Sequence, residues 1–570
     1  MPPLALLAPI ALPLVAGGLT AALGLAGFKP GRAIVGAGAW GALVVLFILW
    51  LPIRSTEELT LGPLGFGAGF DLRLDGVAFA FGLVILLPSA ILLTLQPRTW
   101  QEGTVAALGV AAAVLAVEAG GVLLTALAGG TAATLAVIQL DIEDIRAPRP
   151  PWGALLAAWL ALSWAGAILQ VVGGTAVYAA VPVSALTVPV FSLLAVAALM
   201  ASGLFPWRGW PAQLWSRPSL RAAGMAVATL YPLGFYLLVR AYEMGDGSYP
   251  QPILGVALAC LGVLVSLGVA VRAQAAATRR EYLGELIPGL GGFALMAIAI
   301  GTPVGLVAGI VVLATIGVLA ASLPLLPDRS GPSTLLTIAA AVGVPPGLAF
   351  GALAVAIAAT FGAGDFMGLI GIAGAAVWIL FMLAAARAVG LPAGRGHPAI
   401  ETSPRTVMAL AAVLLIAGAA LPVVVTLLAV PAQADVMPRS AGLGGGLVSV
   451  ATVQTDLPAL TLFAPLLLLG AIAYGLAGGL GVQRGPRREP VPVVDQKSAS
   501  TPRSAPPRRP VFTIPGIDVP KRWLDAVRKA AVPEEYRSIV NLRALEKAAA
   551  GGRPLLWLAT LIALAYAVNR

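Results

Sequence analysis

The sequence is poor in charged residues and has only one cysteine and one histidine. Charged residues make up 11% of its 570 residues and hydrophobic residues 59%, and the mean hydropathy is +0.94. A soluble domain would carry about 25% charged residues. The single Cys260 excludes a disulfide framework and a cysteine-ligated cluster. This composition predicts an all-α polytopic membrane protein.

Sequence motifs of enzymes are also missing. The chain has no Walker loop, no dinucleotide fingerprint and no catalytic triad, and His397 stands alone in a predicted loop. We therefore predict no cofactor, no metal and no catalytic activity of the chain's own.

Apolar runs that could cross a membrane recur along the chain. A span needs about 20 apolar residues, and this rule predicts about sixteen transmembrane helices. They lie near residues 3–27, 33–53, 76–96, 103–117, 121–140, 152–172, 183–206, 222–240, 252–271, 284–300, 303–325, 333–361, 366–386, 406–430, 457–482 and 554–569.

Basic residues favour one side of this topology. If the N-terminus lies outside, fifteen Lys and Arg residues before Gln483 fall in inner loops. The outer side holds only Arg54, Arg73, Arg240, Arg439 and Arg570. Positively charged loops stay on the cytoplasmic side. The bias predicts a multi-pass protein of the prokaryotic cell (inner) membrane with its N-terminus outside.

The longest polar stretch, residues 484–553, is basic, with fifteen Lys and Arg against seven Asp and Glu. Residues 484–517, rich in Pro, Ser and Arg, predict an extended cytoplasmic linker. Residues 518–550 predict an amphipathic lateral helix on the inner face, followed by a C-terminal anchor helix in 551–570. Its apolar stripes include Trp523, Val527, Ile539 and Leu545. We expect it to contact anionic lipids or neighbouring subunits. Nucleic acid is not an expected partner, because the stretch has no interleaved aromatic platform.

Four stretches carry a family resemblance. They are Phe70–Gly76, Pro206–Ser219, Arg279–Leu306 and Gly343–Leu353. The last reads Gly-Val-Pro-Pro-Gly-Leu-Ala-Phe-Gly-Ala-Leu and resembles a Gly-Ile-Pro-Pro-x-x-Gly-Phe-x-Ser-Lys signature. In order and spacing the four resemble the antiporter-like (proton-translocating) membrane subunits of respiratory complex I, Mrp antiporters and group 4 membrane-bound hydrogenases or formate hydrogenlyase.

The resemblance implies a domain organisation with two inverted five-helix repeats. Residues 1–101 would hold helices 1–3, 102–241 the first repeat and 242–388 the second. Residues 389–483 would add further transmembrane helices before the linker. Such subunits work inside multi-subunit assemblies, so other membrane subunits are the implied partners.

The family's proton path would run through positions that hold no ionisable residue here. The aligned lysine and histidine positions are Ala201, Ala226, Val312, Ile316, Ala320 and Leu353. The span-five glutamate falls near residues 126–128. Residues 153–205, 222–239, 287–327 and 331–364 contain no Asp, Glu, Lys, Arg or His. Pro189, Pro345 and Pro346 predict breaks in the helices that carry some of these positions.

Acidic residues remain near the ends of predicted spans. Glu118 and Asp365 are expected at the membrane interface, and Asp141, Glu143 and Asp144 in a solvated inner loop. The favoured function is a structural, non-proton-conducting subunit of a complex I-like or hydrogenase-like redox assembly.

Three alternatives stay open. One is a transporter of a neutral solute, with a cavity lined by Gln139, Gln170, Thr187 and Ser202. Another is a subunit that still conducts protons through water or Glu118. A membrane transferase would need the acids at 141–144 to bind a metal.

Overall fold

The structure, a computed structural model, describes residues 3–28, 32–51, 55–65, 68–95, 99–143, 152–204, 210–215, 217, 220–326, 332–345, 347–363, 365–389, 391 and 404–437. The last two predicted spans, the linker and the lateral helix with Trp523, Val527, Ile539 and Leu545 lie outside these residues.

The first part of the described chain contains nine α-helices and a β-hairpin. The helices are α1 (Ala8–Leu25), α2 (Arg32–Trp50), α3 (Gly76–Leu95), α4 (Trp100–Glu118), α5 (Val122–Glu143), α6 (Trp152–Gly173), α7 (Val188–Ala201), α8 (Trp210–Leu214) and α9 (Arg221–Met244). Strands β1 (Glu57–Gly65) and β2 (Ala68–Leu74) pair antiparallel between α2 and α3.

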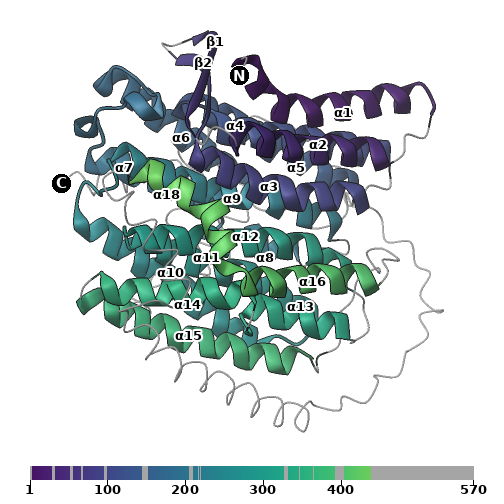
Figure 1. Cartoon of the computed structure of the whole chain (residues 1–570), viewed down its shortest axis with the longest axis vertical. Coiled ribbons are helices and arrows are strands. Elements are labelled where there is room, and N and C mark those ends of the chain that lie inside the picture. Colours follow the sequence, from purple (N-terminus) through teal and green to yellow (C-terminus); the bar gives the residue numbers. More distant parts are fainter. Residues whose placement is uncertain are drawn as a thin grey trace, which may run out of the picture.

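The second part is helical throughout its described residues. It comprises α10 (Pro252–Ala275), α11 (Arg279–Ala299), α12 (Pro303–Ser322), α13 (Pro332–Val342), α14 (Leu348–Gly362), α15 (Asp365–Val389), α16 (Pro404–Ala419), α17 (Leu421–Val424) and α18 (Val430–Val436), with a short π-helix at Val425–Ala429. The two parts pack side by side, with α1 and α15 on opposite flanks (Figure 1).

Sequence signals at several helix starts explain where the helices begin. Thr99, Thr278 and Thr302 are extended residues whose hydroxyls accept a hydrogen bond from a backbone N–H in the first turn of α4, α11 and α12. This capping satisfies one of the N–H groups that a helix start leaves without an intrahelical partner. Pro303 follows as the first residue of α12, where a proline loses no helical hydrogen bond.

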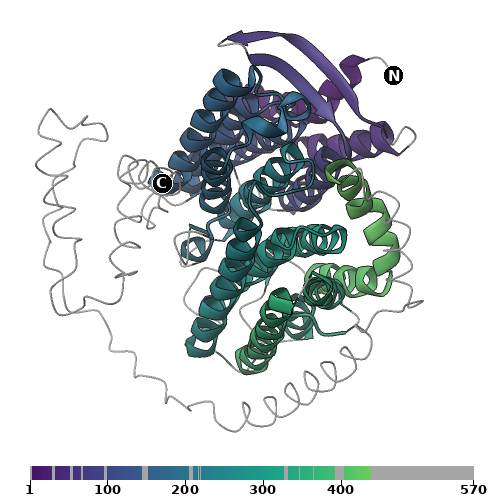
Figure 2. The same cartoon turned by 90° about the vertical axis from the view of Figure 1, so that its left-hand side faces the viewer.

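The membrane-spanning character is clear in the described residues. Eleven helices are long and apolar enough to cross a membrane, or twelve if one bent pair counts as a span. The predicted span 183–206 is shorter as a helix, because α7 begins only at Val188 and Gly203 turns the chain with a φ of +67°. The predicted span 406–430 is bent by 88° between Ala419 and Leu421. Figure 2 shows this bent pair in green, ending beside the early, purple helices.

The helix ends form two groups, which we call the hairpin end and the opposite end. At the hairpin end, Leu72 of β2 bridges Ala119 after α4, and Gly121 bridges Val177 after α6. At the opposite end, Arg221 pairs with Glu102 and Glu143. Arg73 and Arg240 thus lie at one end of the helices and Arg221 at the other.

Helix α9 forms the centre of the first part. It packs against α3, α4, α5, α7 and α12, and it also contacts α18. All of its residues except Glu243 are buried, as is most of α11. A helix that is apolar on every face belongs in the interior of such a bundle. Of the positions aligned with the family's proton path, Ala226 lies on this central helix, and Leu353 lies on α14, which packs on α12. The others lie on α7 and α12, which pack against α9.

Candidate functional site: the positions aligned with the family's proton path

The six aligned positions lie on four helices that contact one another in succession. Helix α7 packs on α9, α9 on α12, and α12 on α14. The positions are Ala201 on α7, Ala226 on α9, Val312, Ile316 and Ala320 on α12, and Leu353 on α14. Each is at most 1% exposed. The structure therefore gathers them in the protein interior, where an unpaired charge would be costly.

The backbones of these helices approach each other closely beside two of the positions. A Cβ added to Gly224 of α9 would lie 2.7 Å from the carbonyl oxygen of Ala320. A Cβ added to Gly234 would lie 2.4 Å from the backbone nitrogen of Ser202, next to Ala201. Glycine allows such an approach because it has no side chain. Neighbouring backbone thus fills the space beside Ala320 and Ala201.

The hydroxyl groups in this region bond to their own helices. Ser202 donates to Ala198 O at 2.9 Å, Thr229 to Met225 O at 2.9 Å, and Thr315 to Val311 O at 3.1 Å. Ser322 and Thr360 do the same on α12 and α14. Such bonds to a carbonyl three or four residues earlier are local. Each of these hydroxyls therefore bonds within its own helix.

The proline positions lie at helix ends. Pro189 occupies the first turn of α7, and Pro345 lies between the end of α13 at Val342 and the start of α14 at Leu348; Pro346 is outside the described residues. Gly343 has a φ of +81°, and Trp378 of α15 donates its indole N–H to Val342 O at 2.8 Å. The carbonyl freed at this break is therefore satisfied by protein.

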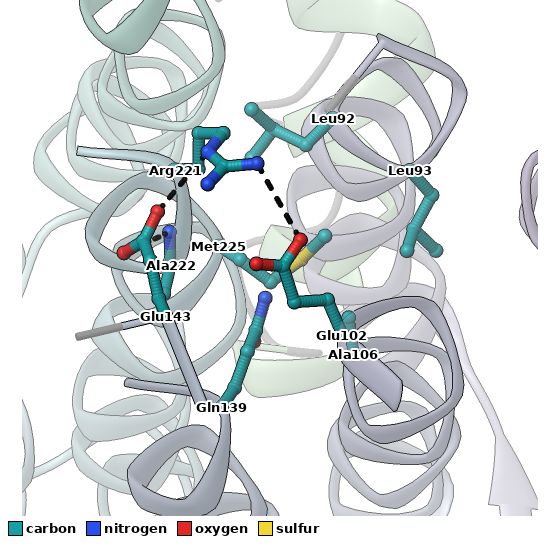
Figure 3. A pocket seen from close by; sticks show the side chains of 9 residues that line it. All are labelled: Leu92, Leu93, Glu102, Ala106, Gln139, Glu143, Arg221, Ala222 and Met225. Atoms are coloured by element: carbon teal, nitrogen blue, oxygen red, sulfur yellow. Dashed lines mark hydrogen bonds and ion pairs between the residues drawn. The ribbon is translucent and has the colours of Figure 1, made fainter. Parts of the chain in front are cut away.

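A small pocket lies at the opposite end between α3, α4, α5 and α9 (Figure 3). Arg221 reaches Glu102 at 3.4 Å and Glu143 at 3.2 Å, and Glu143 also accepts the Ala222 N–H at 3.2 Å. The amide of Gln139 points into the same space. The cavity, about 20 Å³, suits one water molecule with several polar partners.

This pocket corrects one expectation from the sequence. Glu143 does not lie in a solvated loop, because α5 continues to this residue and its side chain is only 2% exposed. The pairing with Arg221, far away in the sequence, explains why it is buried. The pocket ends at Met225, beside Ala226, and its other walls are the apolar residues Leu92, Leu93, Ala106 and Ala222.

A buried ion network at the hairpin end was not predicted. We define it as Arg73, Asp75, Arg240, Glu243 and Asp435. Arg240 contacts both oxygens of Asp75 at 2.7 and 2.9 Å and Glu243 at 2.6 Å. Arg73 lies 3.0 Å from each of the same two acids, and Asp435 of α18 accepts the Gly76 N–H at 2.5 Å. The network joins β2, α9 and α18.

Two tyrosines complete the surroundings of Arg240. Its guanidinium lies 5.3 Å from the ring centre of Tyr178 and 5.0 Å from that of Tyr236, and its Nε donates to the Tyr236 hydroxyl at 3.0 Å. Burial raises the pKa of Tyr178 well above its usual value of about 10, so its hydroxyl stays protonated and donates to Thr125 at 2.9 Å. Burial alone would raise the pKa of Asp75, but Arg240 and Arg73 hold it below its usual range. A buried charge that is fully paired is the expected outcome here.

Glu118 contradicts the expectation of an interfacial residue. It is the last residue of α4 and only 2% exposed, and neither carboxyl oxygen has a hydrogen-bond partner among the described residues. Of the other residues singled out, His397 lies outside the described residues, and only the backbone of Asp365 is described, at the start of α15. No group of three or more metal-binding side chains occurs in the described part of the chain.

The chain is similar in structure to several solved membrane-protein chains. No family model and no curated protein matches this sequence. A chain of the Mrp complex from Dietzia sp. is similar with a TM-score of 0.68 and 19% identity, over 100% of this chain and 63% of that one. A chain of respiratory complex I from Thermus thermophilus is similar with a TM-score of 0.62 and 21% identity, over 76% of this chain and 99% of that one.

An archaeal respiratory membrane complex, the membrane-bound sulfane sulfur reductase, also contains a similar chain. Its TM-score is 0.62 at 16% identity, with 98% of this chain and 100% of that one covered. The chain has the antiporter-like fold. This fold agrees with the resemblance seen in the sequence, and the chain spans about two thirds, 63%, of the length of the Mrp chain that it matches.

Proposed function

We propose that the protein is a structural, non-proton-conducting antiporter-like subunit of a multi-subunit membrane assembly related to complex I, Mrp or hydrogenase-type complexes. The observation that carries this proposal is the packing at Ala201, Ala226, Ala320 and Leu353. Each of these positions is buried in apolar surroundings, and backbone from a neighbouring helix fills the space beside two of them. Proton transfer needs titratable side chains or a continuous chain of water, and the interior described above supports neither.

Proton flux in proteoliposomes tests the proposal. The full-length protein is reconstituted into vesicles with a pH-sensitive dye inside, and a pH or sodium gradient is applied. We expect no more flux than in protein-free vesicles, whereas an intact antiporter of the same fold, reconstituted in parallel, collapses the gradient. Flux at the rate of that antiporter would refute a non-conducting role.

Transport of a neutral solute is the second candidate, and the structure gives it little support. The four residues expected to line its cavity are spread over the fold. Gln139 lies at the opposite end of α5, whereas Gln170 lies near the hairpin end of α6 and donates to Gly174 O at 3.1 Å. The Ser202 hydroxyl bonds within its own helix. These side chains do not line one cavity.

The role in assembly rests on the basic segment at the C-terminus. We propose that residues 518–550 form a lateral helix on the cytoplasmic face that holds neighbouring subunits, with 551–570 as its anchor. Its charge and its apolar stripes suit a membrane surface or a flanking subunit. Deletion of residues 520–550 should release partner subunits on native gels while the remaining spans stay in the membrane. An assembly that stays intact after the deletion would exclude this role.

A further inference from the structure

Glu118 is an unusual carboxyl group for its place in the fold. It ends α4 at the hairpin end, where its side chain is 2% exposed and both oxygens are buried without a hydrogen bond. Neither the pocket at the opposite end nor the hairpin-end ion network includes it. A buried polar group without a partner calls for an explanation, and an ionisable group inside a membrane protein is by default a candidate functional site.

Backbone covers Glu118 from the hairpin side. Ala119 bridges Leu72 of β2, Gly120 donates to Asp71 O at 2.7 Å, and Tyr178 donates its N–H to Gly120 O at 2.9 Å. Next to these bonds, Leu72, Ala119 and Leu124 form a small apolar cluster. The residue thus lies beneath a layer in which the backbone groups already bond to one another.

The two cations on the elements packed against α4 at this end already pair with other acids. Arg73 and Arg240 pair with Asp75 and Glu243. Asp71 on β2 is itself an acid and cannot neutralise a carboxylate at Glu118. Helices α1 and α5 bring no charged side chain to this end in their described residues. None of these groups makes an ion pair or a hydrogen bond with Glu118. A carboxylate here would be an isolated buried anion, which costs far more than a buried neutral acid.

We propose that Glu118 is a proton-binding site, a carboxylic acid that carries its proton in the folded protein at neutral pH. The ligand is a single proton, and the backbone layer formed by β2 and residues 119–121 and 176–178 shields it from the hairpin side. The site has no continuation, because α4 carries no other ionisable side chain between Glu102 and Glu118. This inference does not depend on the proposed function, since a proton can be held without being passed across the membrane.

Infrared spectroscopy of the full-length protein in lipid tests the proposal directly. A protonated carboxyl has a C=O stretch separate from that of a carboxylate, and we expect this band at pH 7. Glu118→Gln should remove one such band. Glu243→Gln is the matched control, because Glu243 lies at the same end but pairs with two arginines, and it should leave the band in place. Absence of the band in the unmodified protein, or its survival in Glu118→Gln, would overturn the proposal.

Folding of the variants gives a second, independent measurement. Glutamine has the shape and charge of a protonated glutamate, so Glu118→Gln should match the unmodified protein below about pH 4.3 and should have a higher unfolding midpoint at pH 7, where ionisation of Glu118 in the unfolded chain lowers the stability of the unmodified protein alone. One extra proton in the folded state makes the folding equilibrium constant fall tenfold per pH unit above about pH 4.3, and Glu118→Gln should lack this dependence. Failure of Glu118→Gln to fold would show that the negative charge is needed and would also overturn the proposal. The flux assay is separate, because flux that persists in Glu118→Gln would contradict only the non-conducting role.

Discussion

Arg240 and Asp75 face each other with two hydrogen bonds, of 2.7 and 2.9 Å, although 165 residues separate them in the sequence. Both side chains are completely buried. A planar guanidinium that meets both oxygens of a carboxylate is among the strongest ion-pair geometries. This pair fixes the end of α9 against the start of α3.

Removal of Arg240 should destabilise the fold strongly. Arg240→Leu would leave Asp75 and Glu243 buried with only Arg73 as a cation, and breaking a buried pair typically costs about 3–5 kcal/mol. The measurement is thermal unfolding of the purified protein in detergent. Arg272→Leu is the comparison, because Arg272 is one-third exposed although its partner Glu285 is buried, and its loss should therefore destabilise the fold less than the loss of the fully buried Arg240. Equal losses in the two variants would contradict the role of the network.

The contribution of Asp75 should depend on pH in a defined direction. Arg240 and Arg73 hold the pKa of Asp75 below its usual value despite burial, so its stabilising effect is complete above the unfolded-state pKa of about 3.9. It is then lost as the pH falls through the lower pKa of the folded state. Asp75→Asn should lower the unfolding midpoint at pH 7, and the gap to the unmodified protein should narrow below about pH 4. A difference in unfolding midpoint that widens as the pH falls would have the opposite sign and would refute this assignment.

A single lysine should not restore conduction. Leu353→Lys places a cation at a site that is 1% exposed, with a penalty of at least about 2.5–3.5 kcal/mol on insertion scales. We expect lower stability and no proton flux, because Ala201, Ala226 and Ala320 still interrupt the path. Leu353→Met, which keeps the volume, should cost less than about 1.5 kcal/mol. Proton flux through Leu353→Lys in vesicles would show that the interior holds more water than its packing indicates.

The contact between α18 and α3 requires a glycine. A Cβ on Gly76 would lie 2.3 Å from the carbonyl carbon of Pro431, and backbone atoms cannot move aside as a flexible side chain can. Gly76→Ala should therefore cost about 1–3 kcal/mol and loosen α18, detectable as faster proteolysis near that helix. In Gly18→Ala the added Cβ meets nothing within 4 Å, so this change in α1 should be neutral or slightly stabilising. Similar behaviour of the two variants would argue against a close α3–α18 contact.

Much of the helical architecture could be predicted from the sequence, because long apolar runs and the side preference of arginine are local signals. The interruption between Val342 and Leu348 lies where Pro345 stands. Periodicity and composition could not show that Asp435 reaches Gly76 across 359 residues, or that Arg221 draws Glu143 into the protein. Such pairings depend on which helices become neighbours in three dimensions.

The 88° bend between Ala419 and Leu421 was also beyond a count of apolar residues, which reports length but not direction. The burial of Glu118 was likewise not predictable from the sequence. Its position at the end of an apolar run is typical of an interfacial residue, and only the return of β2 and of residues 176–178 over it reveals that it is covered. The residues at the family's ionisable positions are named from the resemblance and stay a prediction, whereas the tight contacts beside Ala320 and Ala201 required coordinates.

Helix α9 has an arginine near each end and no charged side chain between them. Arg221 and Arg240 are 19 residues apart, and at about 1.5 Å per residue this separation is about 28 Å, close to the thickness of the hydrocarbon core. Arg221 pairs with Glu102 of α4 and Glu143 of α5, and Arg240 pairs with Asp75, which directly precedes α3. Sliding α9 along its axis, or rotating it, would break the ion pairs at both borders of the membrane together. The ion pairs at its two ends thus hold α9 in one position relative to α4, α5 and the start of α3.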